Sequence, residues 1–363
     1  MSAKKLSKAL AAPTDANMPP KSRHKRITIP FPEESSSPPP PTFIEVCAGA
    51  GGLSSGLMRA GFVPLLLNDI DRDCCATLRK NHAGCNVICG PMETLDLTEY
   101  RGKVDLFVGG LNCQSWSLAG QRKGLDDPRG QLMVHFANML HTLRPKMFMI
   151  ENVKGLIIHN GGESIKQILE FLNREGLYDI EYRLLNAAEY GVPQKRERVF
   201  IVGVLKGTGI NFAFPEKSAH NLVLKDILLD VPPSPCAKYS QQKIDLFKKI
   251  PQGGCWVNLT EDEQRAYLGN SYESEGGKRG ILHRLSMEKP SLTLLCTPSQ
   301  KQTERCHPLE ERPLTVREYA RIQTYPDEYE FVGSIASQYK QIGNSVPVEL
   351  ARRMGESLAA ALV

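Results

Sequence analysis

The chain has 363 residues, of which 41% are hydrophobic, and carries a formal net charge of +5. It can therefore form one large α/β domain and a smaller one. It contains neither an apolar run of membrane-spanning length nor a signal peptide, so we expect a soluble intracellular protein. Its ten cysteines lack the paired C-x-x-C spacing of zinc sites, so we expect reduced thiols and no metal.

Residues 1–42 are predicted to form a disordered, basic, proline-rich tail. They hold seven Lys or Arg against three acidic residues, and so carry most of the net charge. The rest of the chain is close to neutral, so bulk charge does not indicate nucleic-acid binding by the folded part. Any such surface must be a local patch.

Order is predicted to begin with a strand over 42–47, followed by a glycine-rich turn, a helix over 54–60 and a strand over 62–67. Asp69 follows about 20 residues after the glycines, where an acidic residue can bind ribose hydroxyls in a nucleoside-binding βαβ unit. The turn lacks the spacing of a P-loop, which favours a nucleoside ligand without a triphosphate. A tight turn without a ligand is the alternative.

Two reactive side chains follow the next strands. A strand over 103–109 leads into the loop that carries Cys113, and a strand over 146–150 ends at Glu151. The carboxyl edge of a parallel sheet is where open α/β folds bind ligands. A thiolate there can act as a nucleophile, and a carboxyl beside it can perform acid-base chemistry. The alternatives are a small buried hydrophobe for Cys113 and a helix cap or ion pair for Glu151.

A basic segment, 194–198, precedes a predicted core strand over 199–204. On an extended segment Arg196 and Arg198 point the same way, so we expect both to aim into the site, toward a phosphate, a carboxylate or a carbonyl oxygen. After Val204 the alternation of predicted strands and helices stops until about residue 290. This predicts a less regular inserted domain with a helix over 240–249. Helices over 314–321 and 348–362 then return the chain to the first domain.

Six segments in this order resemble the DNA (cytosine-5)-methyltransferases, in particular the compact bacterial modification type. They are Glu45–Gly52, Cys113–Ser117, Glu151–Val153, Gln194–Arg198, Arg312–Glu318 and Gln341–Val346. The resemblance implies an α/β fold with a Rossmann-like, S-adenosylmethionine-dependent methyltransferase sheet and an inserted, irregular target-recognition domain. The expected parts are the tail (1–42), the catalytic and cofactor-binding domain (43–206 and 291–363) and the target-recognition domain (207–290).

The same resemblance implies methylation of C5 of a flipped cytosine in a specific duplex DNA sequence, with S-adenosyl-L-methionine as donor and S-adenosyl-L-homocysteine as product. Addition of the Cys113 thiolate at C6 makes C5 nucleophilic. Glu151 would protonate N3 of the ring or form a hydrogen bond to it, and Arg198 would bind O2. Arg196 completes the expected catalytic set. The base must leave the stack to be reached.

Carried over residue by residue, the resemblance implies two further sets of site residues. The cofactor set is Cys47, Ala48, Gly49, Gly52, Asp69, Ile70, Met92, Gly109, Leu132, Asn344 and Val346. The DNA set is Asn112, Gln114, Ser115, Ser117, Gln194, Lys278, Arg279, Arg284 and Thr293. For Lys278, Arg279 and Arg284 a solvated loop is an equal alternative.

The expected partner is double-stranded DNA rather than a membrane, with the chain a monomer and a cognate restriction endonuclease as a further partner. A bacterial host would place it in the cytoplasm or nucleoid, and a eukaryotic host in the nucleus or a viral factory.

The chain departs from the family pattern at three positions. Asn112 replaces the proline before the nucleophile, Cys47 replaces an aromatic residue, and Pro91 replaces an aspartate that contacts adenine. The last two predict weaker cofactor affinity.

Two alternatives stay open, an RNA cytosine-5 methyltransferase and a DNA-binding pseudoenzyme motivated by Asn112. A recognition region of about 80 residues favours DNA, and the joint presence of Cys113, Glu151 and Arg198 favours an active enzyme.

Overall fold

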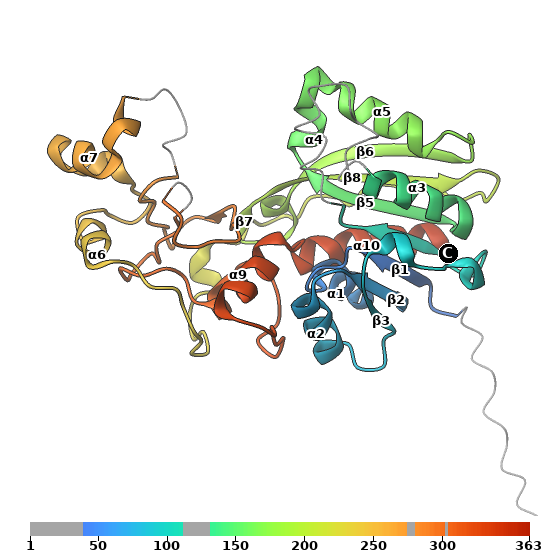
Figure 1. Cartoon of the computed structure of the whole chain (residues 1–363), viewed down its shortest axis with the longest axis horizontal. Helices are drawn as coiled ribbons and strands as arrows, with labels where there is room; N and C mark the ends of the chain where they lie inside the picture. The colour runs from blue at the N-terminus through green and yellow to red at the C-terminus, as the bar shows by residue number, and fades with distance from the viewer. Residues whose placement is uncertain (1–38, 112–130, 274–279, 302–303) are drawn as a thin grey trace, which may run out of the picture. The chain divides into compact units, whose positions relative to one another are not determined.

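The structure is a computed structural model that describes residues 39–111, 131–273, 280–301 and 304–363 (Figure 1). Its centre is a seven-stranded sheet of order β3-β2-β1-β4-β5-β8-β6. The strands are β1 (Thr42–Val46), β2 (Val63–Asp69), β3 (Val87–Cys89), β4 (Leu106–Gly109), β5 (Met147–Val153), β6 (Tyr178–Asn186) and β8 (Glu197–Leu205). The expected parallel pairing is confirmed for β1 to β5, whereas β8 runs antiparallel to both of its neighbours. An antiparallel strand can return through a short connection, without a crossover helix.

The order of the strands places a ligand site. From β1 the chain builds outward through β2 and β3, and from β4 it builds the other way through β5. The carboxyl ends of β1 and β4 therefore flank the point where the order reverses. Open α/β sheets bind their ligands at such a switch point.

Helices cover both faces of the sheet (Figure 1). Those whose residues join the two cores against the sheet are α1 (Gly52–Arg59), α2 (Arg72–Asn81), α3 (Gln131–Leu143), α4 (Gly155–Ile158), α5 (Glu163–Leu172) and α10 (Val348–Leu362). The helices α6 (Gln241–Phe247), α7 (Glu261–Leu268), α8 (Val316–Ile322) and α9 (Ile335–Asn344) belong to other clusters. The predicted bounds of α10 are confirmed. Neither α7 nor α9 was expected. The polar α7 buries one residue, Leu268, and therefore leaves little apolar periodicity to detect.

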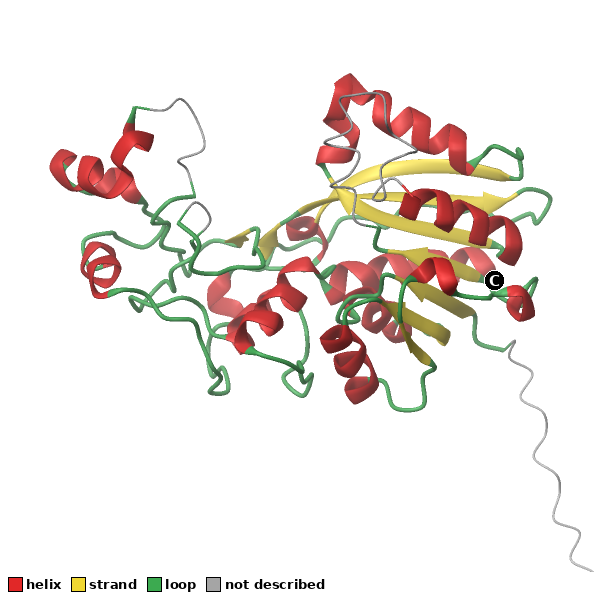
Figure 2. Cartoon of the chain, in the orientation of Figure 1, coloured by secondary structure: helices red, strands yellow, loops and turns green. Residues whose placement is uncertain are grey.

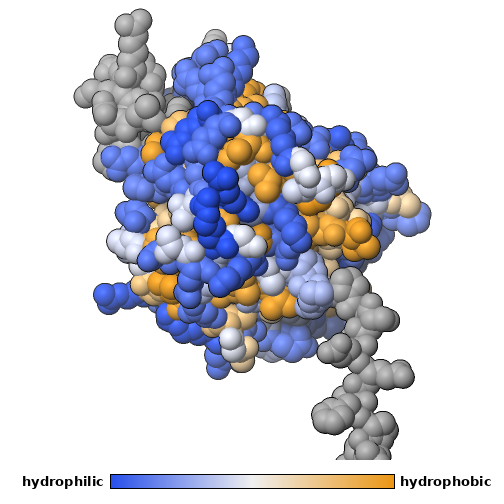
Figure 3. Space-filling model, turned by 90° about the vertical axis from the view of Figure 1, so that its right-hand side faces the viewer, coloured by the Kyte–Doolittle hydropathy of each residue, from blue (hydrophilic) through white to orange (hydrophobic). Residues whose placement is uncertain are grey.

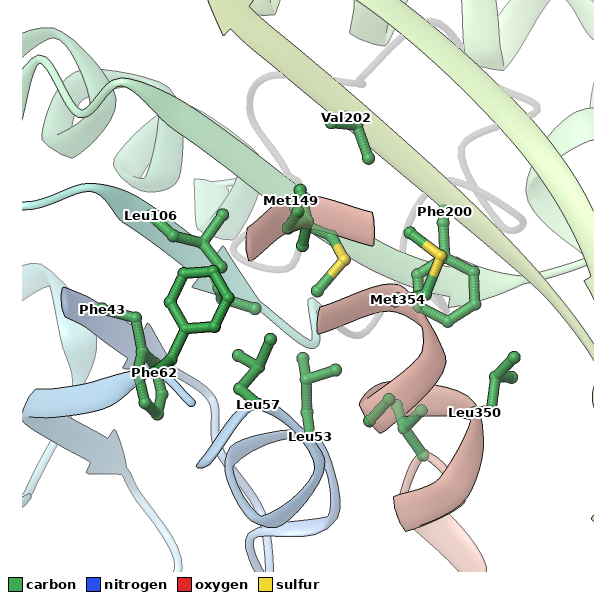
Figure 4. Close-up of a cluster of buried hydrophobic side chains, with 14 of the residues drawn as sticks. Phe43, Leu53, Leu57, Phe62, Leu106, Met149, Phe200, Val202, Leu350 and Met354 are labelled. Carbon is green, nitrogen blue, oxygen red and sulfur yellow. The ribbon is translucent and has the colours of Figure 1, made fainter. Parts of the chain in front are cut away.

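Alternate residues of the central strands pack in two cores, one on each face of the sheet. In β1, Phe43 belongs to the core on the side of α1 and α10, and Ile44 to the core on the side of α3 and α5. Figure 4 shows the first of these cores, with Phe43, Leu53, Leu57, Phe62, Leu106, Met149, Phe200, Val202, Leu350 and Met354 labelled. Packing of α10 on α1 ties the end of the chain to its first helix.

The region after β8 is mostly loop with short helices (Figure 2). Its own small core comprises Phe247, Ile250, Leu259, Leu268, Ile281, Leu282 and Cys306. Leu224 and Leu228 instead pack in a cluster with α8 and α9. A parallel pair of short strands, β7 (Gln194–Lys195) and β9 (Ser291–Leu292), joins this region to the segment before β8. The domain boundaries at 207 and 290 stay a prediction.

The face of the molecule in Figure 3 is largely hydrophilic, with small separate apolar patches. Among the described residues, no helix combines the length and apolarity that crossing a membrane requires.

Candidate active site

The glycine-rich turn after β1 adopts a backbone that leaves open space at Gly49. Cys47, Gly49 and Gly51 all have positive φ, at +54°, +56° and +80°. The turn is tied to β2, because Ala48 N–H donates to Asn68 O at 2.9 Å and Gly49 N–H to Asp69 Oδ2 at 2.8 Å. A Cβ added at Gly49 would meet nothing within 4 Å. A ligand can therefore approach this backbone, at the start of a helix whose first N–H groups have no intrahelical acceptor.

The end of β2 supplies an acid and an exposed apolar side chain. The Asp69 carboxylate accepts from the N–H groups of Gly49 and Asp71, both at 2.8 Å. Burial raises the pKa of Asp69, and these two hydrogen bonds oppose the shift. A carboxylate has about four lone-pair sites, so Asp69 can still accept from ribose hydroxyls. The Ile70 side chain is 69% exposed. It therefore offers an apolar surface on which an adenine could pack.

Other members of the expected cofactor set surround this edge. Cys47 Sγ lies 3.7 Å from Met92 Sδ, and Asn344 Oδ1 accepts from Cys296 Sγ at 2.9 Å. Two glycines of the set have packing reasons. A Cβ on Gly52 would lie 2.1 Å from Ser345 Oγ, and one on Gly109 would lie 2.8 Å from the Phe136 ring. These two glycines let elements approach each other rather than open space for a ligand.

Glu151 and Arg198 form a buried ion pair at the carboxyl end of β5. The distance from Arg198 Nε to Glu151 Oε1 is 3.0 Å, and the two side chains are 13% and 11% exposed. Burial raises the pKa of Glu151, and the Arg198 guanidinium opposes that shift. The pair lies one strand from β4, which leads toward Cys113. A carboxyl held in this way can give or take a proton on a bound ring.

Asn152 lies inside the Glu151–Val153 motif, although no role was predicted for it, and its hydrogen bonds suit a positioning role. Its Nδ2 donates to Leu111 O at 2.9 Å, and its Oδ1 accepts from Val153 N–H at 2.8 Å. Leu111 is the last described residue before the segment that contains Cys113. Asn152 therefore fixes the backbone two residues before the expected nucleophile, where the chain has Asn112 and lacks the stiffening of a proline. Its place beside Glu151 was the available signal.

An Asn152→Ala variant is expected to lower kcat by up to about 100-fold, because a small misplacement of a reacting group has a cost of that order. The KM for the methyl donor should change little. Steady-state kinetics with separate titration of donor and DNA measures both. Asn138→Ala is the matched control, since that exposed amide contacts Arg174 on the outside of the sheet. An unchanged kcat in Asn152→Ala would contradict the positioning role.

The structure does not place Arg196 in the catalytic set. Its side chain is 1% exposed and donates to the carbonyl oxygens of Leu294, Gly343 and Ser345 at 3.1, 2.8 and 2.9 Å. Burial lowers the pKa of Arg196 to about 9. Arg196 lies in the break between β7 and β8, so the alternation that predicted a shared direction with Arg198 does not hold there. It connects its own segment to two others, at Leu294 and at 343–345.

Two expected DNA contacts are also interior residues. Gln194 is fully buried, donates to Gln323 Oε1 at 2.8 Å and accepts from Leu294 N–H at 2.9 Å. Arg284 is 6% exposed and donates to Phe247 O and Glu311 Oε1 at 2.6 and 2.9 Å. Buried side chains that donate to partners inside the protein are not available to bases or phosphates, so we withdraw both from the DNA set.

Thr293 is half-buried, and its Oγ1 donates to Lys195 O at 2.7 Å. The expected nucleophile and the other expected DNA contacts lie outside the described residues. These are Cys113, Asn112, Gln114, Ser115, Ser117, Lys278 and Arg279.

The model of the family described as C-5 cytosine-specific DNA methylase matches residues 41–360. The chain belongs to this family. The expected resemblance, the Rossmann-like methyltransferase fold and the expectation of a DNA (cytosine-5)-methyltransferase are thereby confirmed.

Two relatives show how far the match to this C-5 cytosine methylase extends. The type II methyltransferase M.Eco47II of Escherichia coli is 46% identical over 326 residues, which cover 87% of this chain and 78% of the relative. M.Sau96I of Staphylococcus aureus is 45% identical over 321 residues, which cover 86% and 74%. The likeness thus includes both the sheet and the region after β8.

Solved structures share the fold at lower identity. A prophage-encoded DNA modification methyltransferase of E. coli has a TM-score of 0.66 at 24% identity, and covers 89% of this chain and 99% of its own. A Spodoptera frugiperda DNMT2 variant has a TM-score of 0.66 at 14% identity, with 88% and 99% covered. At these identities the likeness concerns the fold alone.

Proposed function

We propose that this C-5 cytosine methylase methylates cytosine in one specific duplex DNA sequence, as a type II modification enzyme with S-adenosylmethionine as its donor. The observation that carries the proposal is the buried Glu151–Arg198 pair at the carboxyl end of β5, beside the strand that leads to Cys113. The names of M.Eco47II and M.Sau96I, both type II methyltransferases, support the modification role.

Each residue of the proposed site has one task. The Cys113 thiolate forms a bond to C6 of the flipped cytosine, and the electrons of the C5–C6 double bond move into the ring. Glu151 donates a proton or a hydrogen bond to N3, and Arg198 holds O2, so that the ring can carry these electrons. C5 would then take the methyl group from the donor's sulfonium, whose sulfur keeps the bonding electron pair. Loss of the C5 proton to a base and return of the N3 proton to Glu151 restore the C5–C6 double bond and expel the Cys113 thiolate.

The described residues fit the proposed donor. The space above Gly49 admits a ligand, the carboxylate of Asp69 faces the same turn, and Ile70 is exposed beside it. S-adenosylmethionine supplies an electrophilic methyl group on a sulfonium. The chain would bind its ribose through Asp69 and its adenine between Ile70 and the Cys47–Met92 contact, with S-adenosylhomocysteine as the product left in place.

Calorimetric titration with S-adenosylmethionine tests the donor. We expect binding that is weaker than in relatives with an aromatic residue at position 47. A silent titration at millimolar ligand would contradict the proposal.

Bisulfite sequencing of plasmid DNA from cells that express the chain tests the substrate, with cells carrying an empty vector as control. We expect methylated cytosines in one short motif.

A duplex with 5-fluorocytosine at that position tests the nucleophile, because fluorine at C5 cannot leave as a proton and the adduct persists. The adducted peptide should contain Cys113. Methylation of RNA in place of DNA would support the alternative acceptor, and sequence-specific DNA binding without methylation would support the pseudoenzyme.

We also propose that the enzyme acts as a monomer and protects DNA from a cognate restriction endonuclease. The type II relatives support the second statement. Light scattering of the purified chain measures its mass, and a protected plasmid should resist nucleases that cut within the methylated motif.

A further inference from the structure

Two buried tyrosines lie beneath the glycine-rich turn. Tyr325 and Tyr329, which we call the tyrosine pair, belong to the segment between α8 and α9 and are 3% and 5% exposed. Their ring centroids are 4.7 Å apart. The Tyr329 hydroxyl donates to Ala50 O at 2.6 Å, and the Tyr325 hydroxyl shares a hydrogen bond with Ser345 Oγ at 2.5 Å. The pair thus contacts two segments of the cofactor site that lie far apart in the sequence.

The contact at Ala50 fixes the peptide that starts α1. The carbonyl of the Ala50–Gly51 peptide is held by Tyr329, and its N–H donates to Ala48 O at 3.0 Å. Gly51 has a φ of +80° and is the N-cap of α1. With both ends of the peptide held, it cannot rotate and turn its carbonyl oxygen toward a bound carboxylate. The first N–H groups of α1 then keep the direction that favours an anion.

The contact at Ser345 fixes the opposite segment. Ser345 Oγ also donates to Val346 O at 3.1 Å. Both residues pack closely against the start of α1. A Cβ at Gly52 would lie 2.1 Å from Ser345 Oγ and 2.3 Å from Val346 O. Tyr325 therefore sets the place of the segment that carries the expected cofactor residues Asn344 and Val346.

His82 and two arginines of α8 hold the tyrosine pair and its backbone in place. The Tyr329 proton goes to Ala50 O, so the Tyr329 oxygen is free to accept from His82 Nε2, 3.2 Å away. The Arg317 guanidinium donates to Pro326 O and Tyr329 O at 3.0 and 2.8 Å, and Arg321 pairs with Asp327. The pair is consequently a fixed part of the α8 side of the molecule rather than a mobile contact.

We propose that the tyrosine pair positions the cofactor site, by holding the glycine-rich turn and the 344–346 segment at the separation that the methionine part of S-adenosylmethionine needs. This inference rests on the proposed function. The tyrosines act through the backbone of Ala50 and the side chain of Ser345, so they are positioning residues.

A Tyr329→Phe variant tests the proposal, because it removes the hydroxyl and keeps the ring. We expect calorimetry to show about fivefold to tenfold weaker binding of both S-adenosylmethionine and S-adenosylhomocysteine, the effect of losing one hydrogen bond. The KM for the donor should rise by a similar factor, with kcat at saturating donor and DNA affinity unchanged. If the hydroxyl only stabilised the fold, its loss would not raise the KM for the donor while leaving kcat unchanged.

Tyr319→Phe is the matched control. Tyr319 is fully buried, and within the described part of the chain its hydroxyl has no hydrogen-bond partner. We expect it to bind both ligands within twofold of the wild type. If Tyr329→Phe fails to fold, Tyr325→Phe and Ser345→Ala test the second contact by the same titration, and each should weaken binding.

The outcomes separate the two proposals. A wild-type chain that binds neither ligand would overturn the proposed function, and this inference with it. A wild type that binds, together with tyrosine-pair variants that bind equally well, would overturn this inference alone. Equal weakening in Tyr319→Phe and Tyr329→Phe would also overturn it, because any lost buried hydroxyl would then have the same effect.

Discussion

A Glu151→Gln variant is expected to methylate DNA with a kcat lower by about 10² to 10⁴-fold, the range that a positioned acid or base contributes. The glutamine amide keeps the shape of the side chain and can donate a hydrogen bond to a bound ring, but it cannot transfer a proton. It also leaves the Arg198 guanidinium without its 3.0 Å carboxylate partner. Rapid-quench measurement of the first turnover isolates this chemical step from product release.

Glu197→Gln is the matched control for this variant. Glu197 lies next to Arg198 in β8, but its carboxylate is half-exposed and pairs with Lys154 at 2.9 Å. Surface ion pairs contribute little, so we expect a kcat within twofold of the wild type. Binding of S-adenosylmethionine should be unchanged in both variants. A Glu151→Gln enzyme that retains more than a tenth of wild-type kcat would refute the acid-base role.

Replacing Arg196 with methionine is expected to destabilise the protein by about 3 kcal/mol, since it leaves three buried carbonyl oxygens without their donor. Those carbonyls belong to Leu294, Gly343 and Ser345. Because two of them flank Asn344, binding of S-adenosylmethionine should weaken in the same variant. Urea unfolding measures the first effect and calorimetry the second.

Arg183→Met serves as the comparison for Arg196→Met. Arg183 is an exposed residue of β6 whose guanidinium lies over the Phe214 ring, 4.6 Å from its centroid. A surface change of this kind stays within about 0.5 kcal/mol. If Arg196→Met unfolds at the wild-type urea concentration and loses only kcat, Arg196 acts on the substrate after all. Arg196→Lys should be intermediate, because one ammonium cannot reproduce the guanidinium fork.

The sequence alone is enough to propose much of the candidate site, because its signals are local. The glycine-rich turn, Asp69 and Glu151 each follow a strand that is recognisable from its apolar run, and parallel strands bring their carboxyl ends to one edge. The bounds of α10 are likewise visible in an amphipathic pattern that begins after Pro347. Family membership follows from six motifs in order, which requires no knowledge of how they pack.

The tertiary structure alone showed which of the polar side chains proposed for the site are engaged by distant partners inside the protein. Arg196 and Arg198 look equivalent in the sequence, yet Arg196 reaches carbonyls about a hundred or more residues away, and Arg198 reaches Glu151 across the β5–β8 pair. Gln194 and Arg284 are likewise engaged by distant partners, and so is the tyrosine pair. A buried polar group must be satisfied wherever the fold places an acceptor. Because those acceptors come together only when the chain has folded, no local pattern distinguishes such a residue from one that binds DNA or substrate.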